Sequence, residues 1–142
     1  MAGKAADMSA SLDAITRLPA DTYVYPGHEY TLTNLEFAKW LEPSNQDLES
    51  KLRWAKTQRS LGLGTVPSTL ISEARTNPYL RTNERAILSR FGFDAGATKV
   101  EVIQAIRDLK DGARKWEGDA ENDFGSVGED SRLNCMHLAS KI

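Results

Sequence analysis

Residues 22–31 read TYVYPGHEYT, and the interpretation of the chain starts from them. The β-branched and aromatic residues at 22–25 are typical of a short buried strand. Pro26 and Gly27 end that strand, because proline donates no backbone hydrogen bond and glycine permits a turn. His28 therefore follows the carboxyl end of a strand, where α/β proteins usually hold ligands and metals. The local pattern leaves two interpretations of His28 open: a metal ligand or, the simpler one, a loop residue bonded to a nearby carbonyl.

Most of the remaining chain is patterned for helices. Apolar residues recur at intervals of three and four in 8–17, 31–41, 45–61 and 98–115, and shorter helices are expected at 69–76 and 82–91. Thr98 and Glu101 have the spacing of a capping box. Residues 65–69 are expected to be extended, because Pro67 keeps the residue before it out of helical conformation.

The predicted fold is therefore mainly α, with one short strand at 22–25. A strand must satisfy its backbone groups with a partner. That partner is either a sheet upstream of this sequence or a substitute within it, and otherwise the strand stays exposed.

Composition narrows the class of protein. The chain has 142 residues, of which 40% are hydrophobic and 27% charged, as in a folded globular domain. No apolar run reaches membrane-spanning length. The net charge of −2 is not the strong positive charge that is typical of a nucleic-acid-binding protein. Acidic residues gather in 117–130 and leave a mildly positive body that suits a small anionic ligand. The single Cys135 excludes an internal disulfide and fits a reducing compartment. Residues 1–7 and 117–142 are expected to be poorly ordered.

Motif blocks extend far beyond residues 22–31. In order they are LPADTYVYPGHEYT (18–31), NLxFA (34–38), EP (42–43), KLxWA (51–55), TVPSTL (65–70), NPYLR (77–81) and AIRDLK (105–110). In their residues and in their order, these blocks resemble glyoxalase II, the hydroxyacylglutathione hydrolases. The resemblance extends from about residue 8 to residue 115. Those enzymes belong to the metallo-β-lactamase-like group. The resemblance therefore implies the carboxyl-terminal helical domain of a metallo-β-lactamase-like α/β enzyme, with the short strand as a remnant of the other domain.

The resemblance also implies roles for four residues. His28 matches a ligand of one of the two metal ions, zinc or iron, in these enzymes. Tyr30 matches a tyrosine that holds the glutathione backbone, and Arg107 and Lys110 match the pair that binds its glycine carboxylate. Helical spacing puts Arg107 and Lys110 on one side, and a guanidinium with an ammonium suits a carboxylate. Without the resemblance, Tyr30 is equally well a packing residue, and a solvated charged face is the better interpretation of the two basic residues.

The same resemblance implies an incomplete metal centre. The other metal ligands of the family, a His-x-His-x-Asp-His stretch, a further histidine and a bridging aspartate, lie upstream of the matched segment. This sequence has two histidines, His28 and His137, whereas zinc hydrolases need three protein ligands. We expect no stably bound metal and no catalytic residue in this chain, although the complete enzymes hydrolyse glutathione thiolesters such as S-lactoylglutathione.

The expected organisation has three parts: 1–30, a remnant of the metallo-β-lactamase-like domain; 31–116, a helical glutathione-binding domain; and 117–142, an acidic, disordered tail. The favoured interpretation is a carboxyl-terminal portion of a glyoxalase-II-like hydrolase. Its expected compartment is the cytoplasm, or the mitochondrion if a targeting segment precedes it.

The alternative is a natural non-catalytic module that binds a glutathione-like ligand or a protein. A third interpretation, an unrelated helical scaffold, is disfavoured by the ordered blocks. In each case an exposed strand edge favours self-association or a covering partner.

Overall fold

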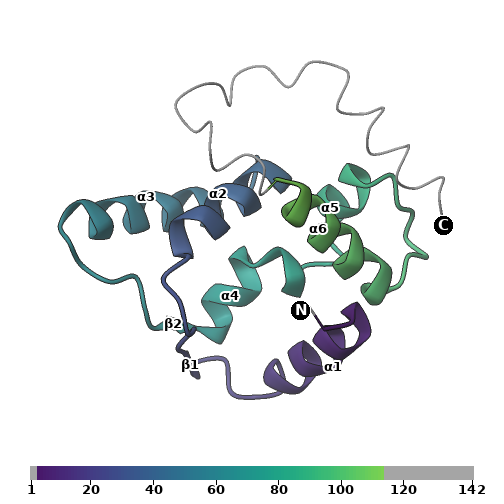
Figure 1. Ribbon diagram of the computed structural model, residues 1–142, viewed down its shortest axis with the longest axis horizontal. Helices are drawn as coiled ribbons and strands as arrows, with labels where there is room; N and C mark the ends of the chain where they lie inside the picture. The colour runs from purple at the N-terminus through teal and green to yellow at the C-terminus, as the bar shows by residue number, and fades with distance from the viewer. Residues whose placement is uncertain (1–2, 114–142) are drawn as a thin grey trace.

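The computed structural model describes residues 3–113, which fold mainly into helices as predicted (Figure 1). In chain order the elements are α1 (Ala5–Ile15), β1 (Tyr23–Val24), α2 (Thr31–Leu41), α3 (Gln46–Ser60), β2 (Ser68–Thr69), α4 (Leu70–Thr76), the 3-10 helix η1 (Pro78–Leu80), α5 (Arg85–Arg90) and α6 (Lys99–Ala113). The predicted acidic tail at 117–142, with Cys135 and His137, lies outside the described residues.

Helix ends follow local signals in the sequence. Asn45 caps α3, because its side-chain oxygen accepts a hydrogen bond from the Leu48 amide at 3.1 Å. At the start of α6, the Glu101 carboxylate accepts from the Thr98 amide at 2.7 Å, and the Glu101 amide donates to the Thr98 hydroxyl at 3.3 Å. The predicted capping box is thus confirmed. Gly92 has a φ of 70° just after α5, a conformation that glycine adopts without strain.

The first part of the core lies between α2 and α3, which run side by side (Figure 1). Leu35 and Ala38 of α2 pack with Leu48 and Ala55 of α3, and all four side chains are buried. These residues belong to the apolar stripes predicted from spacing. The pair therefore makes a rigid base for the loop that precedes α2.

The second part of the core joins α6 to the end of α2 and to α5. Its buried members are Leu41, Ile87, Val102 and Ile106. α6 also packs against α1. The packing of α6 against its neighbours leaves Val102, Ile103 and Ile106 fully buried. It also orders the start of α1, since Ala5 is buried; the expectation that residues 1–7 are poorly ordered was wrong for residues 5–7.

The short strand finds a partner inside the chain. β1 pairs antiparallel with β2, with Tyr23 opposite Thr69 and Val24 opposite Ser68. The Leu70 and Ile71 amides continue the pairing by donating to carbonyls of the segment before β1, at 3.0 and 2.9 Å. Of the fates expected for this strand, the substitute partner is the one observed. The predicted extended segment 65–69 supplies it, so the structure has one strand more than the sequence indicated.

Among residues 3–113, no helix combines the length and the apolar character that crossing a membrane requires.

Candidate ligand-binding surface

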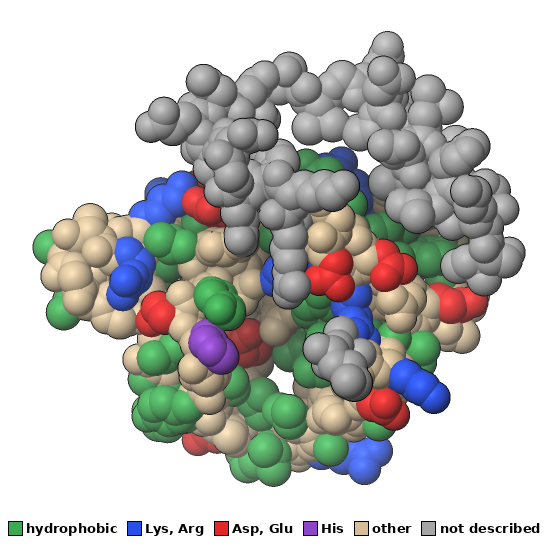
Figure 2. All heavy atoms as spheres, viewed as in Figure 1, with side chains coloured by type: hydrophobic (Ala, Val, Ile, Leu, Met, Phe, Trp, Pro, Cys, Tyr) green, Lys and Arg blue, Asp and Glu red, His purple; other side chains and the backbone are tan. Residues whose placement is uncertain are grey.

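His28 and Tyr30 project from the loop between β1 and α2. Their rings stack, with centroids 5.2 Å apart and planes inclined by 5°. Both side chains are exposed, Tyr30 to 62%. In Figure 2 the histidine, in purple, lies at the molecular surface beside both hydrophobic and acidic side chains. The two residues singled out in the motif are therefore neighbours and accessible to a ligand.

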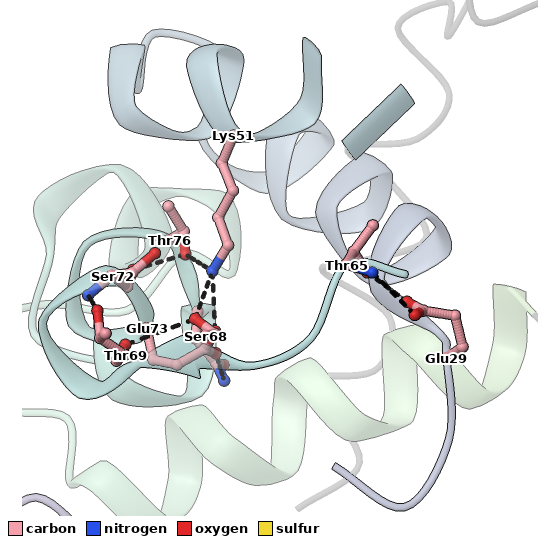
Figure 3. Close-up of polar contacts among 9 residues, drawn as sticks. Glu29, Lys51, Thr65, Ser68, Thr69, Ser72, Glu73 and Thr76 are labelled. Carbon is pink, nitrogen blue, oxygen red and sulfur yellow. Dashed lines mark hydrogen bonds and ion pairs between the residues drawn. The ribbon is translucent and has the colours of Figure 1, made fainter. Parts of the chain in front are cut away.

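Glu29, between them in sequence, holds this loop to a distant segment. One carboxylate oxygen accepts a hydrogen bond from the Thr65 amide at 3.1 Å, and the other accepts from the Thr65 hydroxyl (Figure 3). Thr65 itself is buried. The side-chain and backbone hydrogen bonds from Thr65 hold the pKa of Glu29 below its usual range. Local sequence patterns assign no role to Glu29, because its partner lies 36 residues further along the chain.

Lys110 of α6 contacts α2 one turn after Tyr30. Its ammonium donates to the side-chain oxygen of Asn34 and lies 5.5 Å from the centroid of the Phe37 ring. The Asn34 amide in turn donates to the Tyr30 carbonyl at 2.9 Å. Arg107 is half-buried and one turn before Lys110 on the same side of α6. The fold thus places Lys110 on Asn34, one turn of α2 after Tyr30. Arg107 lies one turn before Lys110 on α6.

A complete metal centre does not form from the described residues. Within 3–113 no group of three or more histidine, cysteine, aspartate or glutamate side chains is arranged to hold an ion. His28 is the sole histidine of that part of the chain. A zinc hydrolase needs three protein ligands and an open position. His28 can therefore serve as one ligand only beside donors that come from elsewhere.

A part-buried polar cluster joins α3, β2 and α4 (Figure 3). The Lys51 ammonium donates to Ser68 at 3.1 Å, Glu73 at 2.8 Å and Thr76 at 3.2 Å. The Ser68 hydroxyl also donates to Glu73, at 2.7 Å. Burial raises the pKa of Glu73, but hydrogen bonds from Lys51, Ser68 and Asn77 outweigh that effect and leave the pKa below its usual value. The cluster fixes β2, and through β2 the strand that leads to His28.

A second ion pair joins two more of the motif blocks. Arg81 binds the buried Glu42 carboxylate through two nitrogens, at 2.9 and 3.0 Å. These hydrogen bonds raise the pKa of the Arg81 guanidinium. Both residues line a shallow groove at the end of α2. Through this pair Arg81 links the 77–81 block to the end of α2.

Comparison with known proteins identifies the family of the chain. Residues 29–113 match the family described as hydroxyacylglutathione hydrolase C-terminus. A hydroxyacylglutathione hydrolase from Arabidopsis thaliana, named as cytoplasmic, is 40% identical over 117 residues, which cover 82% of this chain and 43% of that protein. The enzyme of the same name from Halorhodospira halophila is 45% identical over 77% of this chain and 44% of its own length. That from Dechloromonas aromatica is 48% identical over 61% of this chain and 32% of its own.

The chain belongs to the hydroxyacylglutathione hydrolase family and corresponds to the carboxyl-terminal part of its members. This confirms the resemblance drawn from the motif blocks and favours it over an unrelated scaffold or a separate binding module. The chain spans less than half the length of these relatives.

Proposed function

We propose that this chain supplies the glutathione-binding surface of a hydroxyacylglutathione hydrolase, together with one metal-ligating histidine. The observation that carries the proposal is the placement of Lys110 on Asn34, one turn of α2 from Tyr30. That contact joins residues 76 positions apart in sequence. The substrate class is a glutathione thiolester, S-lactoylglutathione being the expected example.

The chemistry of these side chains suits glutathione. Arg107 and Lys110 offer two positive charges to the glycine carboxylate, and a guanidinium can bind both carboxylate oxygens at once. The Lys110 ammonium donates a hydrogen bond to the side-chain oxygen of Asn34, and this contact sets where the ammonium lies. The Tyr30 hydroxyl, on an exposed ring, is available to the peptide backbone of the ligand.

His28 is proposed as one ligand of a zinc or iron centre of two ions. The described residues do not complete that centre, so we assign hydrolysis to the whole enzyme and not to this segment. A cytoplasmic location is proposed from the named compartment of the Arabidopsis relative and from the single cysteine.

An NMR titration of the full chain with reduced glutathione tests the binding proposal. We expect a Kd of about 1 mM, because each charge-assisted contact contributes only about 1.5–3 kcal/mol. The variant Arg107→Ala/Lys110→Ala should lose at least tenfold in affinity. The matched control, Arg53→Ala/Lys56→Ala, removes two exposed charges of α3 and should bind as the unaltered chain does. Equal affinity in the Arg107/Lys110 variant would contradict the proposal.

A further inference from the structure

We propose that Glu29 is the positioning residue of this surface: its contact with Thr65 holds His28 and Tyr30 in place at the entrance to α2. The inference rests on the proposed function for the roles of His28 and Tyr30. The contact itself rests on the geometry of the described residues alone.

The loop between β1 and α2 presents both candidate residues at the surface. His28 and Tyr30 stack on each other, and both face solvent. Within residues 3–113, the Glu29 side chain ties the middle of this loop to a distant segment of the chain.

The partner of Glu29 is well anchored. Thr65 is 3% exposed and stands at the start of the segment that leads into β2. Three residues later, Ser68 pairs with Val24 of β1 and contacts both Lys51 and Glu73 (Figure 3). The segment 65–69 is thus fixed at Ser68 by the polar cluster around Lys51, and at Thr65 it presents two hydrogen-bond donors to Glu29. Two bonds to two oxygens restrict both the position and the rotation of the Glu29 carboxylate.

The chain contains a chemically matched pair that does not adjoin the proposed site. Glu101 likewise accepts from the amide and the hydroxyl of a threonine, Thr98, at 2.7 and 2.6 Å. That pair caps the start of α6, at the other end of the helix from Lys110. Glu101→Ala therefore removes the same kind of contact without touching the loop, and it controls for general loss of a glutamate–threonine pair.

The experiment compares four variants of the full chain: Glu29→Ala, Glu29→Gln, Thr65→Val and Glu101→Ala. Backbone order parameters of residues 27–30 are measured by ¹⁵N relaxation, and glutathione affinity by NMR titration. Glu29→Ala should lower the order parameters from about 0.85, the value of rigid backbone, toward about 0.6. It should also weaken glutathione binding at least fivefold. Thr65→Val removes the hydroxyl and keeps the amide, so it should have a smaller effect of the same kind. This variant serves as the test if Glu29→Ala does not fold.

Rescue distinguishes positioning from simple bulk. Glu29→Gln keeps an oxygen for the Thr65 amide and supplies an NH₂ group that the Thr65 hydroxyl can accept. It should restore both order and affinity to within twofold of the unaltered chain, and Glu101→Ala should change neither. Order parameters at 27–30 that stay unchanged in both Glu29→Ala and Thr65→Val would overturn the inference, as would a failure of Glu29→Gln to restore them. Absence of glutathione binding in the unaltered chain would instead contradict the proposed function, and the order parameters would still decide the role of Glu29.

Discussion

Lys51 and Lys110 are both lysines of long helices, but the fold uses them in opposite ways. The side chain of Lys51 is 13% exposed, and its ammonium bonds three acceptors, one of them the Glu73 carboxylate. Lys110 donates to the side-chain oxygen of Asn34 and lies over the face of Phe37. The first arrangement binds parts of the fold together, and the second belongs to the surface that we propose for glutathione. Breaking the polar cluster around Lys51 should therefore affect stability, and altering the surface around Lys110 should affect binding.

The largest expected loss of stability comes from the other buried pair, Glu42 and Arg81. Arg81→Ala leaves the Glu42 carboxylate buried without its cation, and removing one partner of a buried pair typically costs about 3–5 kcal/mol. Because Arg81 is partly exposed, we expect about 3 kcal/mol, measured by chemical denaturation. Glu84→Ala removes an exposed neighbour of Arg81 and should change the free energy of unfolding by less than about 0.5 kcal/mol. Equal losses of stability in Arg81→Ala and Glu84→Ala would contradict the stabilising role of the Glu42–Arg81 pair.

A smaller effect, which depends on pH, should arise at Glu73. Its pKa in the folded chain lies below the ordinary value of 4.5. A lowered folded pKa means that the ionised carboxylate stabilises the fold above about pH 4.5, and that this stabilisation is lost as the pH falls through the folded pKa. Glu73→Gln should lower stability by about 2 kcal/mol at neutral pH, since Lys51 loses a charged acceptor. The variant should also show a shallower loss of stability in acid than the unaltered chain. If both proteins lose stability equally steeply as the pH falls, the ionised Glu73 carboxylate does not stabilise the fold in this way.

The apolar face of β1 offers a test of association. Tyr23 and Tyr25 are 66% and 70% exposed. Their rings lie edge to face, with the ring centroids 6.5 Å apart. Exposed strand edges and aromatic patches favour association. Sedimentation velocity should show dimers or larger species of the full chain at micromolar concentration, and Tyr23→Ser/Tyr25→Ser should shift them to monomer. A monodisperse monomer of the unaltered chain would rule out this expectation.

The smallest expected signal is catalytic. The full chain, supplied with zinc or iron, should hydrolyse S-lactoylglutathione no faster than buffer with the same metal, because the described residues form no group of three ligands. His28→Ala should give the same rate. Robust turnover that disappears in His28→Ala would show that the chain completes a metal centre.

The sequence predicted the parts of this fold that depend on local spacing. The apolar stripes of α2 and α3 pack as expected, and the Thr98–Glu101 capping box forms. The start of α1 was missed, since Lys4 at its amino end makes no side-chain capping bond. The two-residue strand β2 was missed because alternation needs a longer run to be seen.

For the candidate site, the motif identified His28, Tyr30, Arg107 and Lys110, and their roles stay predictions. What the sequence could not indicate is how they are supported. Glu29 meets Thr65 across 36 residues, and Lys110 meets Asn34 across 76. Such contacts depend on tertiary packing, and no local spacing reports them.

We propose that Arg107 and Lys110 bind the glycine carboxylate of glutathione, and a ligand without that carboxylate tests their role. An NMR titration should compare glutathione with its ethyl ester on the glycine carboxyl group, using the same preparation of the full chain. We expect glutathione to shift the amide signals of residues 107–110 and those around Tyr30. The ester should bind about tenfold more weakly, equivalent to about 1.4 kcal/mol, and should lose the shifts at 107–110. Equal affinity for the two ligands, with no response at 107–110, would contradict this proposal.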